Sequence, residues 1–363
     1  MKKYISMMLA VIMAVLCLSA CGQSSSTDST ENPAQTEQTV TEESTTNPTE
    51  EPTDAPTGET EEASEDKLKI VTTIFPEYDW VRQIAGDQIS NMELTMLLDN
   101  GVDLHSYQPT ADDIMKISDC DIFVYVGGES DEWVEDALKE AVNKDMQVIN
   151  LLEVLGDSVK AEEMVEGMQE EEHEHEEEQE DGHDEEYDEH VWLSLKNAQT
   201  LSNAIASALE TADPANKETY AANAASYVEK LAALDTQYQE AVNSASQKTL
   251  LFGDRFPFRY LVDDYGLSYY AAFAGCSAES EASFETISFL AQKVDELGLK
   301  NVMTIEKSDQ KIAKTIIENT KDKNQNILTM DSMQSTTSDD VANGTTYLSV
   351  MENNLNVLKE ALQ

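Results

Sequence analysis

Three segments of the 363-residue sequence place histidine or carboxylate side chains where they can bind a metal ion. His105 lies in a turn after a predicted strand, His190 stands beside acidic residues, and Asp331 ends a predicted strand. Neutral imidazole combined with carboxylate is a common set of ligands for zinc and manganese. Each segment alone is weak evidence. Together they make a divalent-metal site the first hypothesis.

The three remaining histidines, His173, His175 and His183, lie in the acidic tract 162–189, which contains no Lys or Arg. Such a tract has two interpretations, a solvated loop that binds little or a segment that captures metal. The metal interpretation gains support because every histidine lies either in this tract or at a predicted strand exit. No histidine is left over for a hydrophobic core.

Two series of apolar strands alternate with helices and must position these residues. The strands are predicted at 68–75, 91–98, 121–128, 147–151, 249–252, 268–273, 301–305 and 326–330. The helices are predicted at 81–86, 110–119, 132–143, 259–265, 283–297, 307–321 and 347–362. Continuous apolar strands predict parallel sheets covered on both faces, so the expected fold class is α/β with two doubly wound lobes. Ligands of such sheets lie beyond the carboxyl ends of the strands.

A long helical segment, 214–247, separates the two series. Its apolar residues recur at helical spacing, and they are Tyr220, Tyr227, Leu231, Leu234 and Tyr238. A helix of this length reaches more than about 40 Å, enough to lie along both lobes as a strut. A coiled-coil or core helix is the plainer interpretation. The lobes are then expected at 67–213, which includes the acidic tract, and at 248–363.

The first 21 residues combine a basic start with an apolar run too short to span a bilayer, which is typical of an export signal. The signal ends in Leu-Ser-Ala before Cys21, which resembles the bacterial lipoprotein box, in which the cysteine is lipidated. An ordinary signal with an incidental cysteine is the alternative. Residues 22–66 are acidic and rich in Ser, Thr and Pro, so we expect a disordered tether. The chain is therefore predicted to be exported and lipid-anchored at the outer face of the cytoplasmic membrane.

The overall charge and the cysteines narrow the function further. A net charge of −49 repels DNA and RNA, which argues strongly against nucleic-acid binding. It also repels anionic membrane lipids, so the lipid attached to Cys21 is the expected contact with the membrane. Cys120 and Cys276 are the cysteines of the folded part and fall in different predicted lobes. We expect two separate buried thiols, with a disulfide as the alternative.

Residues 67–363 resemble the zinc and manganese substrate-binding lipoproteins of ABC importers, and within them the zinc branch of the cluster A-I solute-binding proteins. The resemblance rests on an ordered series of motifs: Gly-x-x-x-His-Ser-Tyr-Gln-Pro-Thr at 101–110, Asp-Ile-Phe-Val-Tyr-Val-Gly-Gly at 121–128, the His-rich acidic tract, Asp-Glu-His-Val-Trp-Leu-Ser at 188–194, the Tyr-rich helix, and Tyr-Leu-Ser-Val-Met at 347–351. It implies two α/β lobes joined by one long rigid helix, with a divalent cation held in a cleft between them. The implied partner is the permease of an importer, and the protein is implied to be a monomer without catalytic activity.

Carried over by position, the resemblance implies that His105, His190 and Asp331 are metal ligands. Glu306, which follows a predicted strand of the second lobe, is expected to support the ligands rather than to bind the metal. Arg255 stands near the position where the family usually has a third His or a Glu. A guanidinium cannot bind a cation, because it has no available lone pair and does not deprotonate.

We expect Arg255 to pair with Asp331 or Glu306 and to hold the cleft shut. The remaining candidates for the missing ligand are Asp254, Glu279, Glu281, water and a loop histidine. Among these we favour Glu279, because a carboxylate at a strand exit of the second lobe would face the cleft.

Zinc is the expected cargo and manganese the alternative. Both metals suit two histidines with carboxylates, but zinc is the tighter binder in most such sites. The His-acid tract also resembles the loop of the zinc-binding members. We hypothesise that this tract captures zinc weakly near the entrance of the cleft. Measuring zinc uptake in zinc-poor medium after deletion of 162–189 tests that role.

Two rival functions come from other classes. A surface adhesin or metal buffer would use the tether and the acidic tract without transporting metal. A secreted zinc hydrolase would need a vacant metal position that activates water. The hydrolase is disfavoured because the sequence has no His-Glu-x-x-His segment and no Gly-x-Ser-x-Gly elbow.

Overall fold

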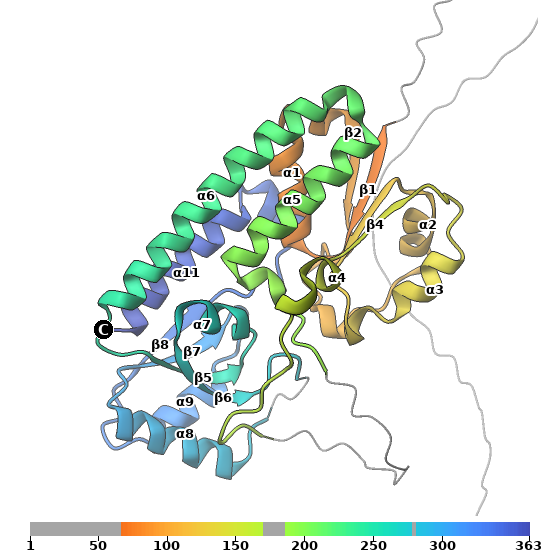
Figure 1. Cartoon of the computed structure of the whole chain (residues 1–363). Helices are drawn as coiled ribbons and strands as arrows, with labels where there is room; N and C mark the ends of the chain where they lie inside the picture. Colours follow the sequence, from red (N-terminus) through yellow and green to blue (C-terminus); the bar gives the residue numbers. More distant parts are fainter. Residues whose placement is uncertain (1–66, 170–185, 278–280) are drawn as a thin grey trace, which may run out of the picture. The chain divides into compact units, whose positions relative to one another are not determined.

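Two four-stranded parallel sheets form the framework of the protein in a computed structural model, which describes residues 67–169, 186–277 and 281–363 (Figure 1). The first sheet contains β1 (Leu68–Thr72), β2 (Met92–Met96), β3 (Ile122–Tyr125) and β4 (Gln147–Asn150). The second contains β5 (Thr249–Arg255), β6 (Ser268–Phe273), β7 (Asn301–Ile305) and β8 (Asn326–Met330). The strand orders, β2-β1-β3-β4 and β6-β5-β7-β8, are the same doubly wound pattern. The predicted pair of α/β lobes is confirmed.

Helices cover both sheets. They are α1 (Phe75–Ala85), α2 (Ala111–Asp119), α3 (Trp133–Lys139), α4 (Leu151–Leu155), α5 (Leu195–Ala212), α6 (Lys217–Ser244), α7 (Arg259–Tyr265), α8 (Phe284–Leu297), α9 (Lys311–Asn319), α10 (Ser338–Ala342) and α11 (Tyr347–Ala361). Figure 1 shows α1 and α5 on one side of the first sheet and α2 and α3 on the other. Because both faces are covered, neighbouring strand residues such as Ile70 and Val71 are both buried.

The start of α1 differs from the prediction. The sequence pattern ended the first strand at Pro76 and placed the helix at 81–86, but α1 begins at Phe75 with Pro76 in its first turn. Proline is tolerated there because the first N–H groups of a helix have no partner within it. Glu77 in the same turn fixes the approach to the helix, since its Oε2 accepts hydrogen bonds from the backbone N–H groups of Thr73 (2.8 Å) and Ile74 (3.2 Å), which precede α1.

The long helix α6 runs past both sheets. Its 28 residues correspond to about 42 Å at 1.5 Å per residue. Its buried stripe contains the five aromatic and leucine residues predicted from the spacing. One end packs against α1 and α5, and the other against α7 and α11. In the described part of the chain, no helix has both the length and the apolarity required to cross a bilayer.

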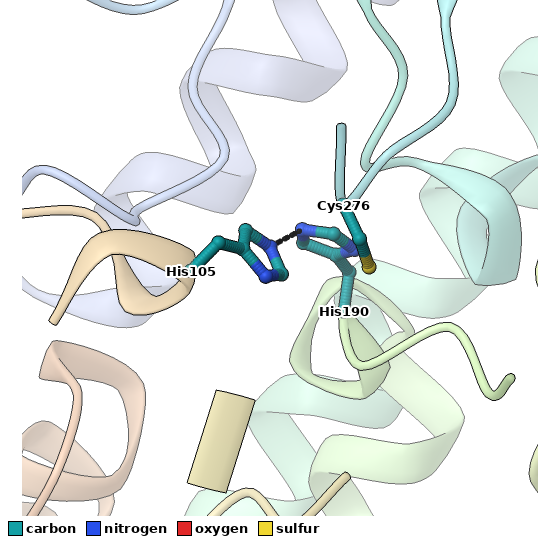
Figure 2. Close-up of side chains that lie close together, drawn as sticks. All are labelled: His105, His190 and Cys276. Atoms are coloured by element: carbon teal, nitrogen blue, oxygen red, sulfur yellow. Dashed lines mark hydrogen bonds between the residues drawn. The ribbon is translucent and has the colours of Figure 1, made fainter. Parts of the chain in front are cut away.

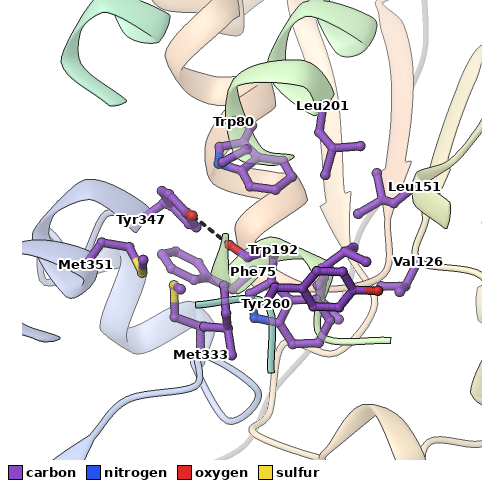
Figure 3. Packing of buried hydrophobic residues seen from close by; sticks show 14 of the residues in the cluster. Phe75, Trp80, Val126, Leu151, Trp192, Leu201, Tyr260, Met333, Tyr347 and Met351 are labelled. Carbon is purple, nitrogen blue, oxygen red and sulfur yellow. Dashed lines mark hydrogen bonds between the residues drawn. The ribbon is translucent and has the colours of Figure 1, made fainter. Parts of the chain in front are cut away.

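Buried side chains of the described residues form two separate cores. The larger core combines residues of both sheets with α1, α5, α6, α7 and α11. Figure 3 shows its centre, where Phe75 and Trp80 of α1 lie near Trp192 and Tyr347. The smaller core fills the far face of the second sheet under α8 and α9, around Leu251. The seam between the lobes therefore belongs to the larger core.

Buried hydrogen bonds also cross this seam. The Trp192 indole donates to the backbone oxygen of Ser332, which follows β8, over 2.8 Å. The Tyr347 hydroxyl donates to the backbone oxygen of Trp192 over 2.6 Å (Figure 3). The backbone N–H of Tyr347 donates to the Asp79 carboxylate of α1 over 2.9 Å. The C-terminal helix is thus fastened to the first lobe as well as to the second.

Candidate metal centre

His105 lies in a short 3-10 turn, Leu104–Ser106, that follows β2. Asp103 caps this turn, because its Oδ1 accepts a hydrogen bond from the His105 backbone N–H over 3.1 Å. The imidazole Nδ1 lies 2.8 Å from the hydroxyl of Ser130 and 3.4 Å from a carboxylate oxygen of Glu189. With Nδ1 engaged in this way, Nε2 is the nitrogen left for a ligand.

His190 is fully buried immediately before the 3-10 turn Val191–Leu193. The His190 backbone N–H donates to one carboxylate oxygen of Asp188 over 2.9 Å, and the ring Nδ1 of His190 lies 3.0 Å from the same oxygen. A carboxylate that holds the distal nitrogen of an imidazole is the usual support of a metal-binding histidine, because it fixes the tautomer and the ring orientation. Again, Nε2 is the nitrogen left for a ligand.

The two histidines face each other through these Nε2 atoms, which are 3.2 Å apart (Figure 2). Zinc–nitrogen bonds of about 2.0–2.1 Å in tetrahedral geometry separate two nitrogens by about 3.3 Å. The pair therefore already has the spacing of two ligands on one ion. This prediction from sequence, that His105 and His190 meet, agrees with the structure.

The electrostatics of the pair favour a neutral His105. Burial and, after it, the neighbouring His190 lower the pKa of His105 to about 3, against the opposing effect of Asp103. Burial also disfavours a charged His190, but the Asp188 carboxylate outweighs it and raises that pKa. Any proton bound by the pair is thus held on His190. His105 presents a lone pair at neutral pH.

Carboxylates stand behind both imidazoles with almost no access to water. Asp131, Asp188 and Glu189 are each 2–3% exposed. Glu189 Oε1 accepts a hydrogen bond from the Ser130 backbone N–H over 2.8 Å, whereas Glu189 Oε2 and Asp131 Oδ1 have no hydrogen-bond partner among the described residues. Burial raises the pKa of Glu189 and raises that of Asp131 to about 7. A bound cation would relieve the cost of these buried charges.

Cys276 is the residue of the second lobe that joins the histidines. Within the described ranges, one potential ligand atom from each of His105, His190 and Cys276 lies within 4.8 Å of the other two (Figure 2). Both Cys276 and Cys120 are free thiols, as predicted, but Cys276 is only partly buried. We expected a carboxylate ligand from the turn after β6 and a buried core thiol at Cys276. Its position just beyond a strand end was the signal that would have found it.

Arg255 does not pair with the expected partners. We expected Asp331 or Glu306, but its guanidinium forms an ion pair with Asp103, the cap of the His105 turn. Burial alone would raise the pKa of Asp103, but the Arg255 charge outweighs it and lowers that pKa. Glu306 is occupied elsewhere, because its two oxygens accept hydrogen bonds from the backbone and hydroxyl of Ser332, each over 2.7 Å. Arg255 thus ties the second lobe to the loop that carries His105.

The remaining predicted residues lie around this group. Asp331 Oδ1 accepts a hydrogen bond from the Met333 backbone over 2.8 Å, and burial together with Glu306 raises its pKa to about 6. Asp254 accepts from the backbones of Arg255 and Ile305, and Glu281 is exposed. None of these three belongs to the group of ligand atoms found among the described residues. A ligand role for Asp331 stays a prediction.

Several predicted residues lie outside the described ranges. They are Glu279, the loop histidines His173, His175 and His183, and Cys21. Of the residues that the structure does describe, it brings two predicted ligands together and adds a thiol. Two imidazoles and a thiol, with buried carboxylates behind them, form a donor set suited to a divalent metal ion.

Comparison with known proteins gives consistent matches. Residues 70–361 match the family model described as ZnuA, zinc-uptake complex component A, periplasmic. The zinc-binding lipoprotein AdcA of Streptococcus pneumoniae is 35% identical over 300 residues, which cover 83% of this chain and 57% of that protein. The high-affinity zinc uptake system protein ZnuA of Bacillus subtilis is 32% identical over 302 residues, 83% of this chain and 89% of the relative.

A solved structure agrees with these matches. The crystal structure of the Zn(II)-bound ZnuA-like domain of Streptococcus pneumoniae AdcA has a TM-score of 0.63 and 31% identity, covering 82% of this chain and 99% of that domain. The chain spans 57% of the length of the AdcA relatives it matches. The likeness is therefore to one domain of those longer proteins.

Proposed function

We propose, from the premise that this chain belongs to the ZnuA family of zinc-uptake components, that it captures Zn²⁺ between its two lobes and delivers it to the permease of an ABC importer. The zinc-binding names of the relatives and the zinc-bound domain of AdcA support zinc over manganese. The permease as partner and the monomeric state rest on the family resemblance. The protein acts here as a carrier of its cargo and not as an enzyme.

One observation carries this proposal. The Nε2 atoms of His105 and His190 face each other at 3.2 Å, and each ring is held at its other nitrogen. A histidine pair that served only packing would not need both distal nitrogens fixed beside buried carboxylates. Such fixation selects the tautomer that presents Nε2 to a metal.

The position of the protein in the cell follows from the same family. The family model describes a periplasmic component, and AdcA is named a lipoprotein. We place this chain outside the cytoplasmic membrane, anchored to its outer face by a lipid on Cys21. The tract 162–189, with His173, His175 and His183, acts as an accessory that raises the local zinc concentration. The adhesin, buffer and hydrolase alternatives have no comparable support.

Competitive zinc titration of the full chain tests the proposal. We expect one tight zinc equivalent in the wild type and a loss of more than about 100-fold in affinity for His105→Ala and for His190→Ala. That loss exceeds the 10–100-fold typical of a lost outer partner. His183→Ala in the tract is the matched control and keeps the tight equivalent. Unchanged affinity in both single variants would overturn the site.

A further inference from the structure

We propose that the Cys276 thiolate is the third protein ligand of the metal ion held by His105 and His190. This inference deepens the proposed function and rests on it. The observation that carries it is the convergence of the three side chains, whose ligand atoms lie within 4.8 Å of one another (Figure 2). The histidines belong to the first lobe, and Cys276 follows β6 in the second. The thiol thus gives the second lobe a direct bond to the cargo.

The local backbone is built to bring Cys276 against His190. A Cβ atom on Gly275 would lie 3.1 Å from Cε1 and 3.2 Å from Nδ1 of the His190 ring, and 2.9 Å from the Phe256 backbone oxygen. Only glycine leaves room for this close approach. The backbone N–H of Cys276 donates to Glu162 Oε1 over 3.0 Å, which fixes the turn. The thiol is therefore held beside the ring and not in the core.

Three other candidate side chains of the second lobe are committed elsewhere. Arg255 is paired with Asp103 and has no lone pair to offer. Both oxygens of Glu306 accept hydrogen bonds from Ser332. Both oxygens of Asp254 accept from backbone N–H groups. Within the ranges that the structure describes, the Cys276 sulfur forms no disulfide.

The charges around the three side chains also call for a cation. Glu189 Oε2 is buried, has no hydrogen-bond partner in the described part of the chain and lies 3.4 Å from His105 Nδ1. On binding, the Cys276 S–H bond breaks, a sulfur–metal bond forms and the proton leaves to water. The ion brings two positive charges and the thiolate one negative, so the buried carboxylate gains a compensating charge.

A ligand set of two imidazoles and one thiolate has a definite metal preference. Thiolate suits zinc and softer ions, whereas manganese prefers carboxylate and water oxygens. Cys276 therefore makes the site selective for Zn²⁺ over Mn²⁺. Replacing the thiolate by a carboxylate should keep a third ligand but weaken that selectivity.

Cobalt(II) is the probe that reports a metal–thiolate bond, because cobalt–sulfur coordination gives a charge-transfer absorption in the near ultraviolet. We expect this absorption at one equivalent of Co²⁺ in the full-length wild type and in the control Cys120→Ala. We expect Cys276→Ala to lose it and to bind zinc more than about 100-fold more weakly, beyond the effect of a lost outer partner. Cys276→Asp should recover much of the zinc affinity, without the absorption and with a smaller preference over Mn²⁺.

The outcomes separate this inference from the proposed function. If zinc affinity depends on His105 and His190 but Cys276→Ala keeps the affinity and the absorption, the histidine site stands and the thiol ligand is wrong. If neither histidine variant changes zinc affinity, both proposals fall. If Cys276→Ala fails to fold, the thiol ligand is tested by alkylating the wild type with and without zinc. One zinc equivalent should protect Cys276, identified by peptide mass, and unchanged alkylation would overturn the inference.

Discussion

The two sheets have the same strand order, but their carboxyl edges differ in how they hold the side chains of the site. At the first edge, His105 and His190 are each fixed at Nδ1 and left open at Nε2. At the second edge, Glu306 and Asp331 accept hydrogen bonds within their own loops, and Arg255 reaches across to the first edge. The first lobe thus organises imidazoles before the metal arrives, while the second closes over them.

Burial separates the same two edges. Asp131, Asp188 and Glu189 at the first edge are nearly inaccessible, while Asp254 and Asp331 at the second are partly exposed. Buried carboxylates without a full set of partners are costly until a cation comes near. The two imidazoles of the first lobe, with these carboxylates behind them, are therefore expected to contribute more of the metal affinity than the second lobe does.

The largest effect in this comparison is expected at the partner of His190. Asp188→Asn removes the charge that holds the ring Nδ1 at 3.0 Å, so zinc affinity should fall about 10–100-fold. Competitive titration measures the change. Asp157→Asn, which alters an exposed aspartate of the same lobe, should leave the affinity unchanged. Equal zinc affinity in Asp188→Asn and Asp157→Asn would contradict the special role given to the carboxylates of the first edge.

A smaller effect is expected from pH. Zinc binds only the neutral imidazole, and Asp188 raises the pKa of His190 against the effect of burial. A raised pKa means that protons begin to compete at a higher pH, so affinity should fall as pH falls, by about tenfold per pH unit below that pKa for one competing proton. Zinc titrations should be made between about pH 8 and about pH 6, the range in which histidine changes charge. The fall in zinc affinity should begin at a lower pH in Asp188→Asn than in the wild type. An identical profile in both proteins would contradict this assignment.

The smallest effect is expected at Arg255 of the second edge. The Arg255–Asp103 pair is about one-fifth exposed on each side, and such partly solvated pairs contribute up to about 1 kcal/mol. Arg255→Gln should therefore weaken zinc binding by no more than about fivefold, mostly through faster dissociation. A double-mutant cycle with Asp103→Asn, which keeps the cap of the His105 turn, isolates the pair. A loss as large as that of Asp188→Asn would show that closure dominates affinity.

The strands and the long helix were predicted because they follow from apolar periodicity. The strand-exit rule drew attention to His105 and His190, and the family resemblance implied that both bind one metal; the structure brings the two rings together. The sequence pattern misplaced the start of α1, since Pro76 was taken as a strand end when Glu77 caps the helix around it. The ion pair of Arg255 with Asp103 could not be predicted from the sequence, because the two residues lie far apart in the chain and only the loop geometry brings them together. Cys276 was assigned to the core because the residue type alone does not separate packing from ligation, although its position just beyond β6 was an informative signal.

The division of the molecule into two cores has a consequence for local unfolding. The larger core crosses the seam between the lobes, and the hydrogen bonds of Trp192 and Tyr347 cross with it. The smaller core lies only under α8 and α9. Cooperative units follow such contiguous packing, so α8 and α9 can open as one unit while the seam stays closed. Amides of these two helices should exchange with solvent through openings that leave the bound cargo in place, whereas amides of α11 should exchange only when the whole framework unfolds.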